Sequence, residues 1–311
     1  MKLTRKYIPL LAILLLLFIT ACTSDDEKLP SNKTIAYENP VEVIINGYTD
    51  HAMEPFLSPN GQTLFFNSQN TGINTKLYYA TRISDTEFEF QGEVIGANES
   101  QTNQLNAVPD MDETNQFYWT SLREYPTKLD NLHFGTYANG TVTNVGRVQG
   151  DFYVGQEGWL VMDHGISFDG QTLFYNNARF DDENCTGPCE TFLGMAKKES
   201  NGVFKKIANS TTILAQINDP NYIYYAPAIT KDELELYYSR YLAANPSETT
   251  VVEICVATRT DKIKAFGMPT VLFSSPAATI LEAATLSADK KRMYYHQKIN
   301  GNHKIFVRTR E

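Results

Sequence analysis

The stretch SPNGQTLFF, from Ser58 to Phe66, recurs almost unchanged as SFDGQTLFY from Ser167 to Tyr175. Each copy joins a polar turn containing glycine to an apolar run that ends in two adjacent aromatic residues. Three further segments carry such an aromatic pair after a polar turn: NQFYWTS, LELYYSR and KRMYYHQ. A unit that recurs along the chain is typical of folds made from stacked copies of one element.

Each unit contains four short apolar runs. A second run follows each aromatic pair: KLYYATR, NLHFGTY, TFLGMAKK, EICVATR and KIFVRTR. A weaker run comes after it in four of the units, and another apolar run precedes each turn. These runs have the length and composition of strands, and no stretch has the pattern of a long amphipathic helix. Four-stranded units repeated around an axis are propeller blades, so the sequence predicts an all-β, five-bladed β-propeller over residues 39–311.

The two ends of the repeat region indicate how the ring closes. The fifth unit stops at Glu311 after its third strand, so its outer strand is missing. The segment NPVEVIING, residues 39–47, precedes the first unit and resembles those outer strands. We therefore expect this N-terminal strand to complete the last blade, which removes an exposed sheet edge.

The units resemble the TolB-type, WD-like propeller repeat. The resemblance is carried by EPFLSPNGQTLFFNSQNTG together with KLYYATR, and more loosely by the other four units. It implies the propeller fold but not a function, because propellers serve as enzymes, binding modules and scaffolds alike.

The chain begins with a targeting segment. Lys2, Arg5 and Lys6 precede the apolar run YIPLLAILLLLFITA, which predicts a signal peptide at residues 1–21. Its end, ITAC, resembles a bacterial lipobox, which implies that Cys22 becomes the lipid-bearing N-terminus. The alternative is an ordinary secretory signal with an incidental cysteine.

Residues 22–38 are expected to form an acidic flexible tether. TSDDEKLPSNK resembles the acidic export signal of Bacteroidota surface lipoproteins. This resemblance implies a membrane partner reached through the lipid anchor and an outer-membrane location facing the exterior, with the periplasmic face as the alternative.

The net charge and the cysteines indicate which partners and which kinds of site the chain can have. The net charge of −9 argues against nucleic acid as a partner. Cys185 and Cys189 in CTGPC are predicted to form a disulfide, and Cys255 a buried thiol. The sequence has no glycine-rich phosphate loop or serine elbow, and the acidic run at residues 181–183 lacks the spacing of a calcium loop. We expect neither a cofactor nor a metal.

Acidic residues near the starts of the innermost strands are candidates for catalysis. Carboxylates on different blades can converge around the axis, as in five-bladed glycosidases of the arabinanase type, which use an acid, a base and a pKa-tuning carboxylate. This is an analogy of fold, since the local motifs of that family are absent. The alternative is that these side chains bind backbone groups or face solvent. The candidates are Glu54, Asp110, Asp163 and Glu282, with His51 and His164 nearby.

Basic residues after the aromatic pairs are candidates for ligand binding. Arginines arranged in a ring could bind carboxylate or sulfate groups through paired hydrogen bonds. The alternative is that they brace the blades, because the TolB-type repeat tends to carry arginine there. Trp159, Tyr125 and Tyr241 could stack on sugar rings. The basic candidates are Arg123, Arg179, Arg240 and Lys298.

The sequence favours a cell-surface lipoprotein whose propeller recognises glycans or envelope partner proteins. The first alternative is a polysaccharide-active enzyme, a glycoside hydrolase or a lyase, that uses the channel carboxylates or histidines. The second alternative is a non-catalytic subunit of an outer-membrane assembly.

Overall fold

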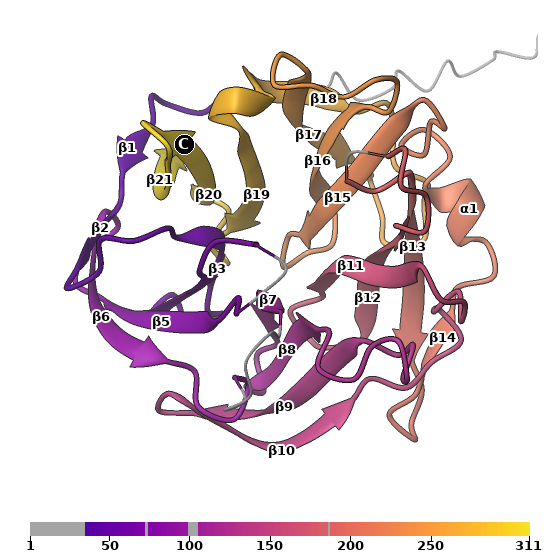
Figure 1. Cartoon of the computed structure of the whole chain (residues 1–311), viewed down its shortest axis with the longest axis horizontal. Coiled ribbons are helices and arrows are strands. Elements are labelled where there is room, and N and C mark those ends of the chain that lie inside the picture. The colour runs from indigo at the N-terminus through magenta and orange to yellow at the C-terminus, as the bar shows by residue number, and fades with distance from the viewer. Residues whose placement is uncertain (1–34, 72–73, 99–104, 186) are drawn as a thin grey trace, which may run out of the picture. The chain divides into compact units, whose positions relative to one another are not determined.

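The computed structural model describes residues 35–71, 74–98, 105–185 and 187–311. The expected signal peptide, Cys22 and most of the tether lie outside these residues. Residues from Ile35 to the C-terminus form one compact unit, four residues longer at its start than the expected propeller. It contains five sheets arranged around a central axis (Figure 1). The five-bladed propeller predicted from the repeat is confirmed.

Each blade is an antiparallel sheet whose first strand lies nearest the axis. Blade 1 comprises β3 (Met53–Leu57), β4 (Thr63–Asn67), β5 (Leu77–Arg82) and β6 (Glu87–Glu93). Blade 2 comprises β7 (Asn106–Met111), β8 (Gln116–Ser121), β9 (Leu132–Ala138) and β10 (Thr141–Arg147). Blade 3 comprises β11 (Trp159–Ile166), β12 (Thr172–Arg179), β13 (Glu190–Lys198) and β14 (Phe204–Lys206).

Blade 4 comprises β15 (Tyr222–Ile229), β16 (Glu235–Leu242), β17 (Val251–Thr258) and β18 (Thr270–Pro276). Blade 5 comprises β19 (Leu281–Leu286), β20 (Arg292–Ile299) and β21 (Asn302–Thr309). Two short helical turns, α1 (Ser210–Ile213) and η1 (Ala277–Thr279), lie between strands. Within the part of the chain described, no helix is long and apolar enough to cross a membrane.

The N-terminal segment closes the ring, as predicted, but it serves two blades rather than one. β1 (Val41–Glu42) pairs antiparallel with β21 and is the fourth strand of blade 5. β2 (Ile44–Asn46) instead pairs parallel with β6 at the outer edge of blade 1. The chain thus joins the last blade to the first, and Val43 and Ile45 are buried between them with Phe66 and Tyr294.

The aromatic pairs explain why the blades stack. Adjacent residues of a strand point to opposite faces of the sheet, so each pair presents one ring to each neighbouring blade. Phe65 packs with Phe117 of blade 2 at a ring-centroid distance of 5.0 Å, whereas Phe66 belongs to the cluster shared with Tyr294 of blade 5. Both rings of blade 1 are fully buried, and burial of such side chains is the main apolar contribution to the fold.

A ring of hydrogen bonds joins the blades just beyond these aromatics. The residue after each aromatic pair is polar and at most 2% exposed, and its side chain bonds to the innermost strand of the next blade. Asn67 accepts from the Val108 amide (3.3 Å), Ser239 from the Ala283 amide (3.2 Å) and His296 from the Glu54 amide (3.0 Å). Thr120 donates to the Met162 carbonyl (3.2 Å) and Asn176 to the Tyr224 carbonyl (2.8 Å). Each of the five joints between blades therefore has one such bond.

The innermost strands share an irregularity at the same height. In each of them the pairing register shifts within the strand, which marks a β-bulge. Glu54, Val108, Ala226 and Ala283 occupy equivalent bulge positions with φ between 49° and 56°. A positive φ is costly for residues other than glycine, and bulges commonly redirect a side chain next to a functional site.

Substitution of the adjacent Ile44 and Ile45 of β2 tests how this strand closes the ring. Ile45 is 9% exposed within the cluster between blades 5 and 1, whereas Ile44 is 51% exposed. We expect Ile45→Ala to lower the free energy of unfolding by about 2–4 kcal/mol through lost burial and a cavity, and Ile44→Ala by less than about 0.5 kcal/mol. Urea unfolding followed by tryptophan fluorescence measures both. Equal effects would show that β2 is not packed between the blades.

The ring of inter-blade hydrogen bonds is tested by removing one hydroxyl. Ser239→Ala leaves the buried Ala283 amide without its acceptor, which is expected to cost about 1–3 kcal/mol of stability. Ser247→Ala, at an exposed serine of the same blade, is the control and should change stability by less than about 0.5 kcal/mol. A loss at Ser239 no larger than at Ser247 contradicts a role for the ring in stability.

Candidate functional site

The candidate site lies at one end of the central channel, here called the mouth, where the innermost strands begin. The opposite end, where these strands finish in the polar turns, is here called the turn face. A cavity of about 90 Å³ along the axis is lined by all five innermost strands. It has room for several water molecules, and Glu54 and Asp163 are among its lining residues.

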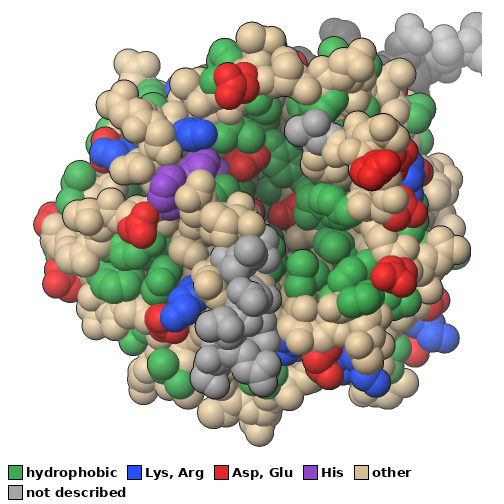
Figure 2. Space-filling model, in the orientation of Figure 1, with side chains coloured by type: hydrophobic (Ala, Val, Ile, Leu, Met, Phe, Trp, Pro, Cys, Tyr) green, Lys and Arg blue, Asp and Glu red, His purple; other side chains and the backbone are tan. Residues whose placement is uncertain are grey.

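Three of the four predicted carboxyls meet at the mouth. Glu54 of blade 1, Asp163 of blade 3 and Glu282 of blade 5 are close enough for their charges to interact. Glu54 lies in the bulge of its strand. Asp163 directly follows the bulge of β11 and pairs with Asn176, and Glu282 directly precedes the bulge of β19 and pairs with His296. Figure 2 shows acidic side chains inside a hollow of this face, with histidine on its rim.

The surroundings of Glu54 and Asp163 favour the protonated form of each carboxyl. Burial raises the pKa of Glu54 well above its usual value, and the charges of Asp163 and Glu282 add to the effect. Burial likewise raises the pKa of Asp163 to about 7, although the Ala226 amide donates a hydrogen bond to it. Glu54 is bound by the Asn70 amide group (2.7 Å) and the Val108 backbone amide (3.2 Å). Both carboxyls therefore also link blades.

Glu282 is held in the ionised state. Burial opposes ionisation, but hydrogen bonds from His296 and Tyr225 outweigh it and lower the pKa of Glu282. His296 Nδ1 accepts the Glu54 amide proton, so the proton of this neutral ring resides on Nε2, 3.1 Å from Glu282 Oε1. The backbone of blade 1 thus fixes the tautomer that stabilises the carboxylate of blade 5.

Two further histidines form the rim next to Glu282. The Nδ1 atoms of His51 and His303 are 2.9 Å apart, and the His303 ring lies 5.4 Å from that of His296. The His303 backbone amide donates to His51 Nδ1, which leaves that atom as an acceptor. Burial and the neighbouring His296, His51 and Lys298 lower the pKa of His303 to about 4, although Glu282 opposes the shift, so the ring is neutral near neutral pH.

Asp110 and His164 line the cavity along the axis. Asp110 lies two residues beyond the bulge position, and its oxygens accept the backbone amides of Met111 (2.6 Å) and Ile166 (2.8 Å). Burial raises its pKa to about 8. His164 is buried along the channel, and burial lowers its pKa to about 3. Asp110 lines the same cavity as Glu54 and Asp163, farther along the strand, and its convergence with these carboxyls stays a prediction.

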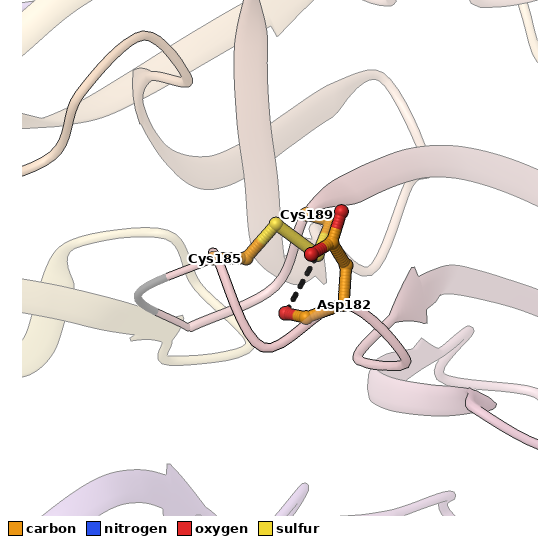
Figure 3. Close-up of side chains that lie close together, drawn as sticks. All are labelled: Asp182, Cys185 and Cys189. Atoms are coloured by element: carbon orange, nitrogen blue, oxygen red, sulfur yellow. Dashed lines mark hydrogen bonds between the residues drawn. A yellow bond between two sulfur atoms is a disulfide. The ribbon is translucent and has the colours of Figure 1, made fainter.

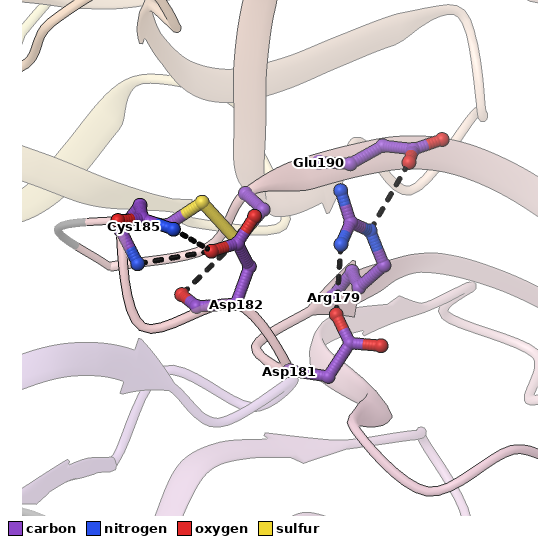
Figure 4. The surroundings of a disulfide bond; sticks show 7 residues. Arg179, Asp181, Asp182, Cys185 and Glu190 are labelled. Carbon is purple, nitrogen blue, oxygen red and sulfur yellow. Dashed lines mark hydrogen bonds and ion pairs between the residues drawn. A yellow bond between two sulfur atoms is a disulfide. The ribbon is translucent and has the colours of Figure 1, made fainter.

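The basic candidates do not form a ring around the mouth. Arg123 binds the Ser121 hydroxyl and the Ala97 carbonyl, and Arg240 pairs with Glu253 at 2.7 Å while stacking on Tyr222. Arg179 pairs with Asp181 (2.7 Å) and Glu190 (3.4 Å), as Figure 4 shows. Lys298 lies near His303. These contacts brace blades and loops, which was the alternative interpretation of the arginines.

The aromatic candidates are packed at the rim. Trp159 is partly buried, and its ring lies 5.9 Å from that of Phe192. The Tyr125 hydroxyl accepts the Gly158 amide, and the Tyr241 ring contacts Tyr225 edge-on. More open apolar side chains lie nearby on the mouth side: Phe180 at 41% exposure and Leu242 at 52%.

The predicted disulfide between Cys185 and Cys189 is confirmed at the tip of the β12–β13 hairpin. Cys189 Sγ also lies 3.7 Å from the Asp182 carbonyl oxygen (Figure 3). Asp182, Cys185 and Cys189 are the single group of potential metal ligands within the described residues. Because the two sulfurs are bonded to each other, they offer no thiolate to a metal. Cys255 is a buried free thiol, as predicted.

Sequence analysis missed His296, His303, Tyr225 and Asn70. The signal for His296 was available, because it is the polar residue that follows the fifth aromatic pair, YYHQ. Comparison of that position across the five units would have marked it as equivalent to Asn67, Thr120, Asn176 and Ser239.

No protein-family model and no curated protein matches the chain. Solved structures of similar fold include a thermostable family-43 glycoside hydrolase, with a TM-score of 0.52, 12% identity, and coverage of 86% of this chain and 91% of that chain. A family-117 glycoside hydrolase of Zobellia galactanivorans has a TM-score of 0.51, 12% identity and coverage of 88% and 90%. An endo-arabinase of Bacteroides thetaiotaomicron has a TM-score of 0.52, 10% identity and coverage of 87% and 98%. These similarities establish the fold.

The raised pKa of Asp163 predicts a pH-dependent cost to stability. Between its usual value of 3.8 and about 7 the folded chain holds a proton that the unfolded chain releases. Stability from this group is therefore greatest at low pH and falls as pH rises through about 7. Asp163→Asn removes this pH dependence. As the pH rises from about 5 to about 8, the free energy of unfolding of the variant should therefore increase by about 1–3 kcal/mol relative to that of the parent chain.

Urea unfolding at the two pH values measures this gain. Asp261→Asn, at an exposed carboxyl on the turn face, is the control and should show no change with pH. A constant difference between the Asp163 variant and the parent chain would mean that Asp163 is ionised throughout.

Proposed function

We propose that the protein is a polysaccharide-active enzyme that cleaves glycosidic bonds at the mouth of the propeller. The proposal rests on one observation: carboxyls from blades 1, 3 and 5 share the mouth, and their surroundings move their pKa values in opposite directions. Glycosidases need one protonated and one ionised carboxyl across the scissile bond. The glycoside hydrolases among the structures of similar fold support the same choice.

Each carboxyl has a role that follows from its environment. Glu54 keeps its proton and is the more open of the two protonated carboxyls, so it is the general acid that protonates the leaving oxygen. Glu282 is ionised and acts on the sugar or on water from the opposite side. Asp163 lies within electrostatic range of Glu54 and Glu282, and when ionised it raises the proton affinity of Glu54. Tyr225 and His296 position Glu282.

The charges around the mouth favour an uncharged glycan. Arg123, Arg179 and Arg240 are held by carboxylates, carbonyls or aromatic rings. An ionised Glu282 at the centre would repel uronates and sulfates. We therefore expect neutral polysaccharides to be preferred substrates.

Product release tests this activity. The chain is incubated with neutral, uronate and sulfated polysaccharides, and new oligosaccharides are detected by mass. We expect products from a neutral polysaccharide, and a loss of at least about 100-fold in rate for Glu54→Gln and for Glu282→Gln. Glu89→Gln, at an exposed glutamate on the outer strand β6, should leave the rate unchanged. The idea fails if no polysaccharide is cleaved, or if either mouth variant keeps full activity in a folded protein.

Recognition without cleavage is the second candidate, and the open apolar side chains of Phe180 and Leu242 beside the mouth favour it. A glycan can stack on such side chains while the carboxyls serve only to join blades. Retained binding of an intact polysaccharide, with no products, would support this function.

We also propose that the protein is a lipoprotein of the outer membrane, anchored through Cys22 and displayed on the exterior. The ITAC sequence and the acidic segment after it support this location. The TolB-like character of the repeat is compatible with it.

A further inference from the structure

The propeller begins on its turn face, at the joint between blades 4 and 5. The Glu38 amide donates to the carbonyl of Thr309, at the end of β21 on this face (2.8 Å). Before it, Tyr37 lies against Phe273 of β18 at 5.9 Å and bonds the Tyr237 hydroxyl at 2.9 Å. Ile35 packs in the same cluster. The segment leading to Cys22 is therefore attached opposite the mouth.

The surface beside this attachment point is apolar and flanked by lysines. The loop between β17 and β18 (residues 259–269) crosses the turn face, directly before the strand that Tyr37 contacts. Its Ile263 and Met268 are 77% and 68% exposed, the highest values among the exposed large apolar residues of the described chain. Lys262 and Lys264 flank Ile263, and both are exposed, although Lys262 also pairs with Glu233 at 2.7 Å. Exposed aliphatic side chains between lysines suit the boundary between head groups and acyl chains.

The charged side chains of the two faces differ. The mouth side carries exposed carboxylates on its loops, including Asp181, Glu183 and Glu248. The turn face presents exposed lysines, including Lys231 and Lys291, beside exposed carboxylates such as Asp169 and Asp289. Anionic membrane surfaces attract basic side chains and repel acidic ones within about 10 Å.

The length of the connecting segment keeps this face near the membrane. Fully extended, the residues from Cys22 to Thr34 reach no farther than about 45 Å. A lipid on Cys22 makes contact between this face and the bilayer an intramolecular event, so a weak apolar contact suffices.

From these observations we infer that the β17–β18 loop docks on the anionic lipid surface that holds the anchor, with Ile263 and Met268 in the interface and the mouth facing away. The inference rests on the proposed lipid at Cys22 and is independent of the proposed glycosidase activity. It gives the mouth free access to a polymer outside the cell.

The test uses the full chain, processed in a bacterium and reconstituted into vesicles of phosphatidylethanolamine and phosphatidylglycerol with brominated acyl chains. A fluorophore is placed at Ile263→Cys, or at Thr249→Cys on the mouth side as a matched exposed control. We expect bromine to quench the label at position 263 several-fold more strongly than at 249. Equal quenching, or stronger quenching at 249, overturns the docking.

Charge substitutions give a second readout. With the label at Asp261→Cys, the double substitution Ile263→Asp and Met268→Asp should abolish quenching, whereas Leu242→Asp on the mouth side should preserve it. Quenching that survives the double substitution overturns the assigned contact.

Flotation of the unlabelled chain with the vesicles distinguishes a failure of the lipid anchor at Cys22 from a failure of the docking of the β17–β18 loop. A chain that does not float refutes both the anchor and the docking. A chain that floats with an unquenched label at 263 refutes the docking alone, and the polysaccharide assay is unaffected in either case.

Discussion

Buried polar groups at the joints between blades constrain this molecule most strongly. Five aromatic pairs bury the faces of the sheets, but apolar packing alone does not fix the height at which one blade meets the next. The polar residue after each pair fixes this height, because its buried side chain needs a hydrogen-bond partner. The nearest backbone groups belong to the innermost strand of the next blade. The aromatic pair and the polar residue that follows it thus supply both the packing and the hydrogen bond at each joint between blades.

The candidate site is an extension of this constraint in blade 5. At four joints the polar residue is Asn, Thr or Ser, and at the fifth it is His296. One ring nitrogen joins the blades, and the other must then donate into the channel, where Glu282 receives it. Burial raises the pKa of Glu54 nearby, and the charges of Asp163 and Glu282 add to the effect. His296 thus joins two blades through one ring nitrogen and stabilises the ionised Glu282 through the other.

The sequence predicted the fold almost completely, because the pattern of a polar turn followed by an aromatic pair occurs five times. A strand that is unclear in one unit can be located by alignment with the others. It predicted the site only in part. Glu54, Asp163 and Glu282 could be placed at the mouth because they precede or occupy the start of an innermost strand. The exact height of Asp110 could not be predicted because a bulge changes which residues face the axis, and bulges have no clear signal in one sequence. His296 is the cross-strand neighbour of Glu282 within blade 5, whereas Tyr225 belongs to blade 4 and comes near only because the blades stack.

The repeat supplies five copies of one backbone position, and chemistry depends on where the copies differ. Glu54, Val108, Ala226 and Ala283 occupy equivalent bulges, and Asp163 directly follows the bulge of blade 3, so the innermost strands present two carboxyls and three apolar side chains near the mouth. Had all five been acidic, mutual repulsion would protonate most of them and leave no defined base. Only two of these five positions carry a carboxyl, and Glu282 lies one residue earlier in blade 5, so each carboxyl has a distinct environment. A symmetric fold thereby holds an asymmetric set of acids, which acid–base chemistry requires.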